Sequence, residues 1–326
     1  MTDLKHKILA MAKDDLEAIE EALLLNLKPH LDLVAQVAGH LLFSGGKRLR
    51  PLLMILSARI CGYKMHDDKK LSTVFEYLHT ASLLHDDIVD GASIRRGRPV
   101  AHSIWGNPTV VLVGDFLLAR SLSIAAETGF INAIKIIAKI TENMSQGEIQ
   151  QLMKKGDFDF SEKEYMEVIR RKTSVLIQGA CSVGALIANA PKKKETALSE
   201  YGLNLGYAFQ MADDLLDYTS DTDVLGKEVG ADLKEGKLTL PVIFALNNAD
   251  SKDRSFMEKV IKNKDFSVHN FKALVELLVK YGGIQYTKKM AVKYVDRAKE
   301  AIYLFKNSET KELLLDVADY VLVRRF

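Results

Sequence analysis

Two groups of aspartates interrupt otherwise apolar stretches of this 326-residue chain. Both groups have the spacing Asp-Asp-x-x-Asp, and their members are Asp86, Asp87, Asp90, Asp213, Asp214 and Asp217. If these stretches are helical, residues four apart share one face, so each group presents its carboxylates together. Buried carboxylates without partners are costly, and hard oxygen ligands suit Mg²⁺, which substrate phosphates usually help to coordinate. The repeated pattern predicts a Mg²⁺ site, with six carboxylates around one cavity if the two helices face each other.

Two short basic segments complement the aspartates. The first follows the glycines at positions 45 and 46, and its cations are Lys47, Arg48 and Arg50. Cations are unfavourable at a helix N-terminus, so their presence at the expected start of a helix predicts an anion shared with backbone N–H groups. The second segment follows the first aspartate group after only five residues and includes Arg95, Arg96 and Arg98. The two segments predict two phosphorylated ligands, one held through metal and one by side chains alone.

The segments that must position these residues carry apolar side chains at a spacing of three to four. They are residues 16–27, 74–89, 131–153, 165–188 and 198–216. This period predicts amphipathic or buried helices, and alternating strand patterns of useful length are missing. No linker, low-complexity stretch or solenoid repeat divides the chain. We therefore expect an all-α protein of ten or more helices that forms a single domain over residues 1–326.

Composition limits the partners and the compartment. The net charge is only +2, with 45 basic and 43 acidic residues, so no global field recruits nucleic acid or a membrane. Two cysteines cannot make a disulfide framework, which is typical of a reducing compartment. The N-terminus has no signal-peptide core, and Asp115 interrupts the most apolar run. We expect a cytoplasmic protein that has no transmembrane segment and binds no nucleic acid.

Together these motifs resemble those of the trans-isoprenyl diphosphate synthases, in particular the long-chain, octaprenyl-type members. The resemblance runs from about residue 40 to residue 242. Besides the six aspartates, the residues that carry it are Gly45, Gly46, Lys47, Arg50, Pro51, His79, Arg95, Arg96, Lys172, Thr173, Gln210, Lys227 and Lys237. It implies an isoprenoid-synthase-type helical bundle around a central cavity, usually a homodimer. It also implies head-to-tail condensation of isopentenyl diphosphate with an allylic diphosphate.

The resemblance further implies a role for each site residue. The aspartates would hold roughly two or three Mg²⁺ ions. Asp86, Asp90 and Asp213 are expected to be direct ligands, supported by Asp87, Asp214 and Asp217. Isopentenyl diphosphate would be bound without metal by Lys47, Arg50, His79 and Arg96. The allylic diphosphate would be bound by Arg95, Lys172, Thr173, Gln210, Lys227 and Lys237. Among these, the expected catalytic residues are Lys172, Thr173 and Gln210. The side-chain oxygens of Thr173 and Gln210 would stabilise an allylic cation.

Product length is expected to depend on small residues beneath the first aspartate group. Ala81 and Ser82 stand where short-chain relatives usually carry an aromatic side chain, so the resemblance implies a long product. Octaprenyl diphosphate for quinone side chains is the best guess, built on a farnesyl-type primer and delivered to a membrane. The floor of the product passage would then lie deeper, and the candidates for it are Phe75, Leu78, Met144, Leu152 and Met153.

Several alternatives remain open from the sequence. The product could instead be geranylgeranyl, hexaprenyl or heptaprenyl diphosphate, or the chain could be a non-catalytic subunit of a heteromeric synthase. A class I terpene cyclase, a structural metal-binding bundle and a solvated acidic face are weaker alternatives, because both aspartate groups and both basic segments are present. His85 is expected to hydrogen-bond within the bundle, and Arg324 and Arg325 could approach a diphosphate.

Overall fold

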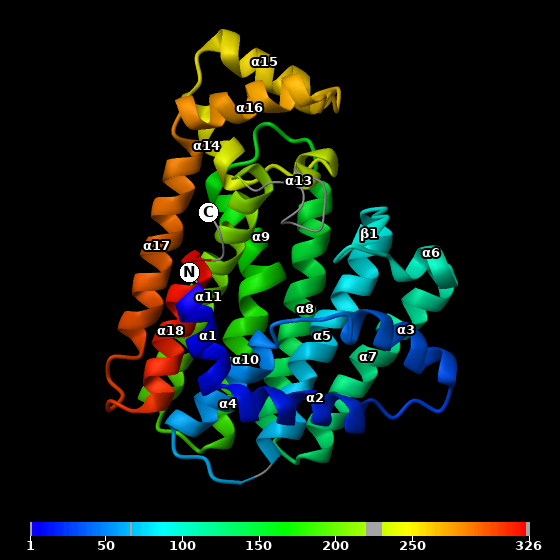
Figure 1. The fold of residues 1–326 in the computed structure, drawn as a ribbon, viewed down its shortest axis with the longest axis vertical. Helices are drawn as coiled ribbons and strands as arrows, with labels where there is room; N and C mark the ends of the chain where they lie inside the picture. The colour runs from blue at the N-terminus through cyan, green and yellow to red at the C-terminus, as the bar shows by residue number, and fades with distance from the viewer. Residues whose placement is uncertain (1, 66, 220–229, 324–326) are drawn as a thin grey trace. The chain divides into compact units, whose positions relative to one another are not determined.

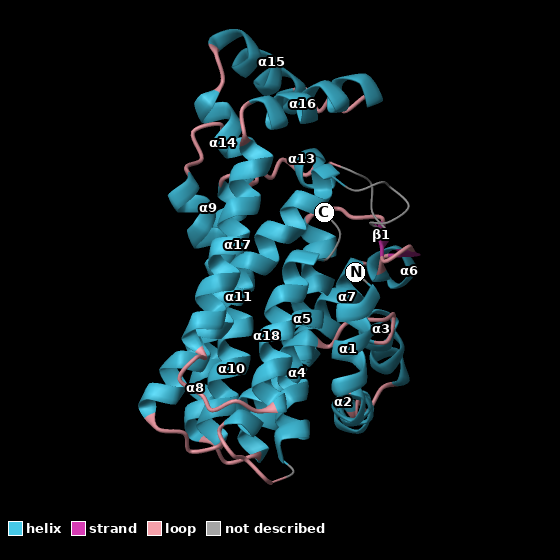
Figure 2. Ribbon diagram, turned by 60° about the vertical axis from the view of Figure 1, so that its left-hand side comes forward, coloured by secondary structure: helices cyan, strands magenta, loops and turns pink. Residues whose placement is uncertain are grey.

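The computed structural model describes residues 2–65, 67–219 and 230–323, and these residues are helical almost throughout (Figures 1 and 2). The expected all-α class with more than ten helices is confirmed. By its internal contacts the chain divides into two compact units, each described below by itself. The single domain over residues 1–326 stays a prediction. Lys227, Arg324 and Arg325 lie outside the described residues.

Unit 1 comprises Met1–Glu142, Leu176–Gly202 and Lys299–Val317. Its first helices are α1 (Thr2–Met11), α2 (Lys13–Leu27), α3 (Asp32–Leu42), α4 (Leu49–Ile60), α5 (Asp67–Val89), α6 (Ala101–Trp105) and α7 (Asn107–Glu127), and α10 (Val175–Ile187) lies largely within it. Helix α5 is the central element, because it packs against α2, α3, α4 and α7 (Figure 1). Its apolar face buries Phe75, Leu78 and Ala81, and the Tyr77 hydroxyl donates a 2.6 Å hydrogen bond to the Leu23 carbonyl.

Helix α7 corrects one expectation from the sequence. By length and composition alone this helix could cross a membrane, with a mean hydropathy of 1.7 in its most apolar window. We expected no such stretch because of Asp115, but Asp115 and Arg120 together do not lower the mean hydropathy enough. In the structure α7 packs along α5 and buries Val110, Val113, Leu117 and Ile124. Packing against α5 accounts for only part of its apolar character, because 39% of that window is buried and Leu112 and Leu122 are 66% and 42% exposed.

The strands found among the described residues form one small hairpin, β1 (Ile94–Arg95) and β2 (Arg98–Pro99), in which Ile94 pairs with Pro99. Its turn places Arg96 and Gly97 at φ values of 52° and 72°. Two successive positive φ values are typical of the tight turns that join antiparallel strands. The hairpin directs Arg95 and Arg96 back toward the end of α5.

Unit 2 comprises Asn143–Val175, Leu203–Ala298 and Ala318–Phe326. Its helices, some of which extend beyond these limits, are α8 (Ile131–Met153), α9 (Glu162–Ile169), the π-helix η1 (Arg170–Ser174), α11 (Lys192–Thr219), α13 (Ala231–Lys234), α14 (Leu240–Asn248), α15 (Ser251–Lys262), α16 (Val268–Lys280), α17 (Gly283–Ala301) and α18 (Glu309–Val323). Helix α9 begins with a capping box formed by Ser161 and Glu164.

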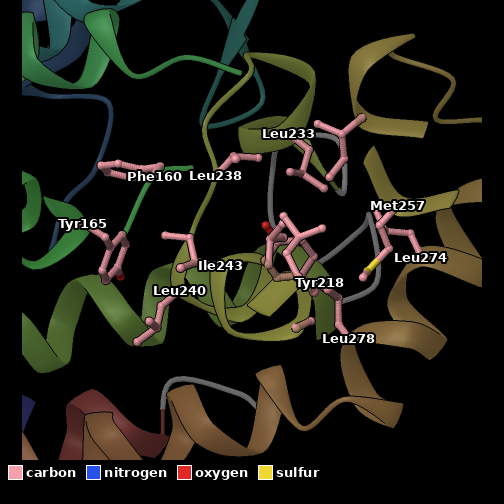
Figure 3. Close-up of a cluster of buried hydrophobic side chains, with 14 of the residues drawn as sticks. Phe160, Tyr165, Tyr218, Leu233, Leu238, Leu240, Ile243, Met257, Leu274 and Leu278 are labelled. Atoms are coloured by element: carbon pink, nitrogen blue, oxygen red, sulfur yellow. The ribbon is translucent and has the colours of Figure 1, made fainter. Parts of the chain in front are cut away.

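A cluster of buried apolar side chains forms the core of unit 2 (Figure 3). It includes Leu233, Leu240 and Ile243 together with the rings of Tyr165 and Tyr218. Both tyrosines satisfy their hydroxyl groups at the edge of this core. Tyr218 bonds to Thr239 at 2.7 Å, and Tyr165 donates to a carboxylate of the second aspartate group. The core therefore fixes α9, α11 and α14 around that group.

Candidate active site

The first aspartate group lies in the last turns of α5. Asp86 and Asp90 are half-buried, whereas Asp87 is 3% exposed. The β1–β2 hairpin brings the Arg95 guanidinium to Asp87. Arg95 Nε donates a 2.7 Å hydrogen bond to Asp87 Oδ1, and Arg95 Nη2 lies 2.6 Å from the same oxygen. A small pocket beside this pair is lined in part by His40. Asp87 therefore fixes Arg95, while its two neighbours in the group reach the more exposed side of the helix.

Cations gather around His79, two turns before the first aspartate group on α5. Burial, and then the charges of Arg50, Arg96 and Arg95, hold the pKa of His79 well below its usual range. Arg96 donates hydrogen bonds to the Gly45 carbonyl and to Ser44 Oγ, the latter at 3.2 Å. The structure thus brings Arg50, His79 and Arg96 into one region of positive potential. Such a region suits a diphosphate bound by side chains.

Arg48 departs from the expectation that it shares an anion with Lys47 and Arg50. Its side chain is 4% exposed and forms ion pairs with Glu20 and Glu76, at 2.6 and 2.8 Å. A buried guanidinium whose donors are already bonded to protein acceptors is not available to a ligand. The expectation for Arg48 is therefore wrong, and the anion-binding cations of this segment reduce to Lys47 and Arg50.

The second aspartate group lies near the end of α11. Asp213 is half-buried, Asp214 is 2% exposed and Asp217 is fully buried. Asp217 accepts hydrogen bonds from the backbone N–H groups of Ala231 and Asp232, at 3.1 and 3.2 Å. These are N–H groups of the first turn of α13, which have no partner within that helix. Asp217 therefore anchors the start of α13 to α11.

Asp214 shows that carboxylates crowd together in this unit. Burial, with the nearby charges of Asp232 and Asp213, raises the pKa of Asp214 to about 8, against the opposing effect of hydrogen bonds from Tyr165 and Gln210. Those two bonds measure 2.6 and 2.8 Å. A bound cation would relieve the repulsion, and the donors are all oxygen atoms, so this set fits Mg²⁺. Sequence reasoning missed Asp232, because its proximity to Asp214 depends on the tertiary path of the chain.

Protein side chains alone do not complete a metal shell. Within residues 2–65, 67–219 and 230–323, no group of three or more His, Cys, Asp or Glu side chains is arranged to hold an ion. Mg²⁺ usually keeps several waters and is held by one or two carboxylates together with substrate phosphates.

The predicted catalytic residues Lys172 and Thr173 lie in the π-helix η1. The Val175 N–H bonds to the Arg170 carbonyl, which is the five-residue spacing of a π-turn. Thr173 Oγ1 donates a 2.7 Å hydrogen bond to Gln210 Oε1, and the Gln210 amide donates in turn to the second aspartate group. The structure thus joins Thr173 and Gln210, and their catalytic role stays a prediction. The amide of Gln210 is oriented by both partners.

Lys172 has two partners that sequence reasoning missed. Its ammonium lies 2.5 Å from Glu148 Oε2 and donates to Gln151 Oε1 at 2.9 Å. The other carboxylate oxygen of Glu148 is buried without a hydrogen-bond partner. The 131–153 segment carries many other polar residues, so nothing in the sequence singles out Glu148 and Gln151. Lys237, the other predicted ligand of the allylic diphosphate in this unit, pairs with Glu235 at 2.6 Å.

The residues expected to set product length are buried on α5. Ala81 has no exposed surface, and half-buried Ser82 donates from Oγ to the His79 carbonyl at 2.8 Å. Phe75 and Leu78 are also buried. The candidates on α8 are less buried. Met144 is half-buried, whereas Leu152 is 38% exposed and Met153 is 78% exposed. Neither of these two closes a buried passage in this chain, so that expectation is wrong for them.

Comparison with known proteins gives the family. The family model described as polyprenyl synthetase matches residues 31–278. The chain belongs to the polyprenyl synthetase family. It is 35% identical to the octaprenyl diphosphate synthase of Haemophilus influenzae over 312 residues, covering 96% of this chain and 94% of the relative. It is 36% identical to heptaprenyl diphosphate synthase component 2 of Geobacillus stearothermophilus over 308 residues, covering 94% and 95%.

The fold agrees with this family. The crystal structure of a polyprenyl synthase from Caulobacter crescentus, in complex with calcium and isoprenyl diphosphate, has a TM-score of 0.93, 38% sequence identity and coverage of 98% of both chains. This polyprenyl synthetase is therefore a prenyltransferase with an all-α isoprenoid-synthase fold, as the sequence motifs predicted. His85 contributes to the packing as expected, because its Nε2 lies 3.1 Å from the Val111 carbonyl.

In this polyprenyl synthetase, glycines allow two helices to approach η1 closely. A Cβ added to Gly206 of α11 would lie 2.5 Å from Ser174 Cα. A Cβ added to Gly147 of α8 would lie 2.9 Å from the backbone nitrogen of Lys172. Gly206→Ala is therefore expected to displace the end of η1 and to lower kcat. Overpacking of this kind should also cost about 1–3 kcal/mol of stability.

The measurements for this variant are steady-state kinetics and thermal unfolding. Gly39→Ala on α3 is a matched control, because its Cβ would only reach ordinary contact with Phe43 at 3.4 Å. Unchanged kcat and unfolding temperature in Gly206→Ala would show that η1 tolerates the added methyl group.

Proposed function

We propose that this polyprenyl synthetase uses Mg²⁺ to condense isopentenyl diphosphate with a farnesyl-type diphosphate into a long-chain all-trans-polyprenyl diphosphate. Octaprenyl diphosphate for quinone side chains is the proposed product. The observation that carries the proposal is the placing of His79 on α5, two turns before the first aspartate group, with Arg50 and Arg96 from other elements beside it. This arrangement supports one diphosphate held by side chains and another held through metal.

The proposed roles follow from the contacts of each residue. Asp86, Asp90 and Asp213, the more accessible carboxylates, would hold Mg²⁺. When bound, Mg²⁺ supplies neutralisation of the charge that develops on the leaving diphosphate. The other three carboxylates support the site: one fixes Arg95, one orients Gln210 and one anchors α13. This division by burial agrees with the ligand and support roles that the resemblance implied.

The remaining groups would bind and orient the substrates. Arg95, Lys172 and Lys237, with Lys227 beyond the described residues, would contact the allylic diphosphate. As the allylic C–O bond breaks, the oxygens of Thr173 and Gln210 would stabilise the cation, with the Gln210 amide held in place from both sides. A new C–C bond forms to isopentenyl diphosphate, and the proton then lost passes to the released diphosphate. No protein base is required.

The proposal includes a cytoplasmic homodimer with roughly two or three Mg²⁺ ions per site, whose product is delivered to a membrane. The second candidate is a subunit that requires a partner chain, and it is favoured by the similarity to a relative named heptaprenyl diphosphate synthase component 2. Geranylgeranyl, hexaprenyl and heptaprenyl diphosphate are the alternative products.

Incubating the purified chain alone with Mg²⁺, isopentenyl diphosphate and farnesyl diphosphate tests the proposal. We expect Mg²⁺-dependent turnover, and mass analysis of the product should give octaprenyl diphosphate. Absence of turnover until a second protein is added would favour the heteromeric candidate. A shorter main product would retain prenyl transfer but exclude the octaprenyl assignment.

Arg50→Ala should weaken binding of isopentenyl diphosphate. Losing one charge-assisted contact typically costs about 1.5–3 kcal/mol, which corresponds to roughly a ten- to hundredfold increase in KM. The KM of the allylic primer should change far less. Steady-state kinetics with each substrate varied in turn provide the measurement. If the effect falls on the primer alone, the two diphosphate sites are assigned in the wrong order.

A further inference from the structure

We propose that Arg48 is the positioning residue of the isopentenyl diphosphate site. Its buried guanidinium would hold the glycine turn before α4 in the one conformation that presents Lys47 and Arg50 to the diphosphate. This inference rests on the proposed function, because Lys47 and Arg50 are assigned to that substrate there. Arg48 itself would not touch the substrate.

The contacts of Arg48 come from three different parts of unit 1. Its Nε donates to Glu20 Oε1 on α2 at 2.6 Å, and Nη1 donates to Glu76 Oε1 on α5 at 2.8 Å. Its Nη2 donates to the Leu42 carbonyl at the end of α3 at 2.6 Å, and to Glu20 Oε2 at 3.2 Å. A planar guanidinium can satisfy all these acceptors together, whereas the ammonium of lysine cannot reproduce this geometry.

The backbone of Arg48 itself adopts a conformation that is uncommon for a residue other than glycine. Its φ is 45°, in the left-handed region, and it directly precedes the first residue of α4. A non-glycine residue pays roughly 1–2 kcal/mol in this region, so the buried hydrogen bonds must offset that cost. Because the side chain at position 48 is held inward, the chain on either side is committed to one direction. Lys47 is then exposed and Arg50 half-buried.

The two glycines of the turn serve different needs. Gly45 has a φ of 95°, a backbone conformation that favours glycine. Gly46 has no such φ, but a Cβ there would lie 2.9 Å from Arg48 Nη1. An alanine at position 46 would therefore displace the guanidinium, whose Nη1 donates to Glu76. On the other side of the turn, Arg96 bonds to the Gly45 carbonyl, so the turn is held from both sides.

The test must separate positioning from simple stabilisation of the fold. The double variant Arg48→Met/Glu76→Leu replaces the buried pair by apolar side chains, an exchange that is often neutral for stability. Glu20 can be solvated afterwards, because its side chain is 45% exposed. We expect an unchanged unfolding temperature, a KM for isopentenyl diphosphate raised about tenfold, and nearly unchanged kcat and primer KM. An unchanged KM for isopentenyl diphosphate in the folded variant would overturn the inference.

A matched control removes another ion pair between α2 and α4. Arg59 at the far end of α4 pairs with Asp15 of α2, and the double variant Asp15→Leu/Arg59→Met should leave the KM for isopentenyl diphosphate unchanged. An equal rise in this control would show that loss of any α2–α4 contact is sufficient. That result would overturn a specific role for Arg48.

Gly46→Ala provides a second measurement, and its effect in the wild-type chain does not depend on the double variant folding. Its Cβ should push the guanidinium aside and raise the KM for isopentenyl diphosphate in the wild-type background. In the Arg48→Met/Glu76→Leu background, where the guanidinium is absent, the same change should have little further effect. Non-additivity of this kind is the signature of direct coupling. Fully additive effects, or no effect of Gly46→Ala in the wild-type chain, would contradict the inference.

Arg50→Ala distinguishes failure of this inference from failure of the proposed function. If Arg50→Ala raises the KM for isopentenyl diphosphate and the Arg48 variants do not, only the positioning role is wrong. If neither has an effect, the substrate assignment of this site is wrong and the inference falls with it.

Discussion

Asp86→Ala and Asp213→Ala should each lower kcat by several orders of magnitude. Removing a single group that stabilises charge in a transition state commonly costs about a hundred- to a thousandfold, and each of these carboxylates would contribute to holding the metal as well. Both are half-buried on helices whose neighbouring aspartates are already occupied by structural partners. Those neighbours cannot readily replace the lost ligand.

Steady-state turnover over a range of Mg²⁺ concentrations measures this effect. Asp115→Ala is a control, because this aspartate is 59% exposed and lies on α7 outside both aspartate groups. It should retain near-normal kcat. Near-normal turnover in Asp86→Ala or Asp213→Ala would remove that residue from the metal site.

Ala81→Tyr should shorten the product while leaving prenyl transfer intact. Ala81 is fully buried on α5, shortly before the first aspartate group, so a phenol ring there would occupy the space that we expect the growing chain to need. Elongation should then stop after few additions, because each added isoprene unit needs new volume beyond the ring. Mass analysis of the products gives the length directly.

The matched control for product length is Ala81→Ser, which adds one small atom and should retain the wild-type length. Thermal unfolding of both variants is required, since overpacking can cost about 1–3 kcal/mol. If a folded and active Ala81→Tyr variant makes the wild-type product, the growing chain does not pass residue 81.

The sequence predicted the aspartate groups and their helices because both depend on local spacing. Apolar neighbours at helical period place Asp86, Asp87 and Asp90 on one element whatever surrounds it. These features are set within one turn or by residues of recognisable type. The contact between Thr173 and Gln210 was not predicted, although the family resemblance gave both residues a common role.

Other parts of the site depend on tertiary structure and could not be read from spacing. Lys172, which pairs with Glu148, lies in a π-turn, and a helical period of 3.6 gives no indication of an extra residue. The direction of Arg48 follows from one backbone torsion and three distant acceptors. In a run of neighbouring cations, charge alone does not distinguish a ligand-binding residue from a buried structural one.

The π-turn at Arg170–Ser174 makes the number of residues in this segment as important as their identity. Deleting one codon there would permit ordinary α-helical hydrogen bonding and would rotate the flanking side chains relative to one another by about 100°. The shortened chain would still contain Lys172 and Thr173, but their side chains would point away from Glu148 and Gln210. Over evolution, we expect this polyprenyl synthetase to accept substitutions in the segment far more readily than insertions or deletions.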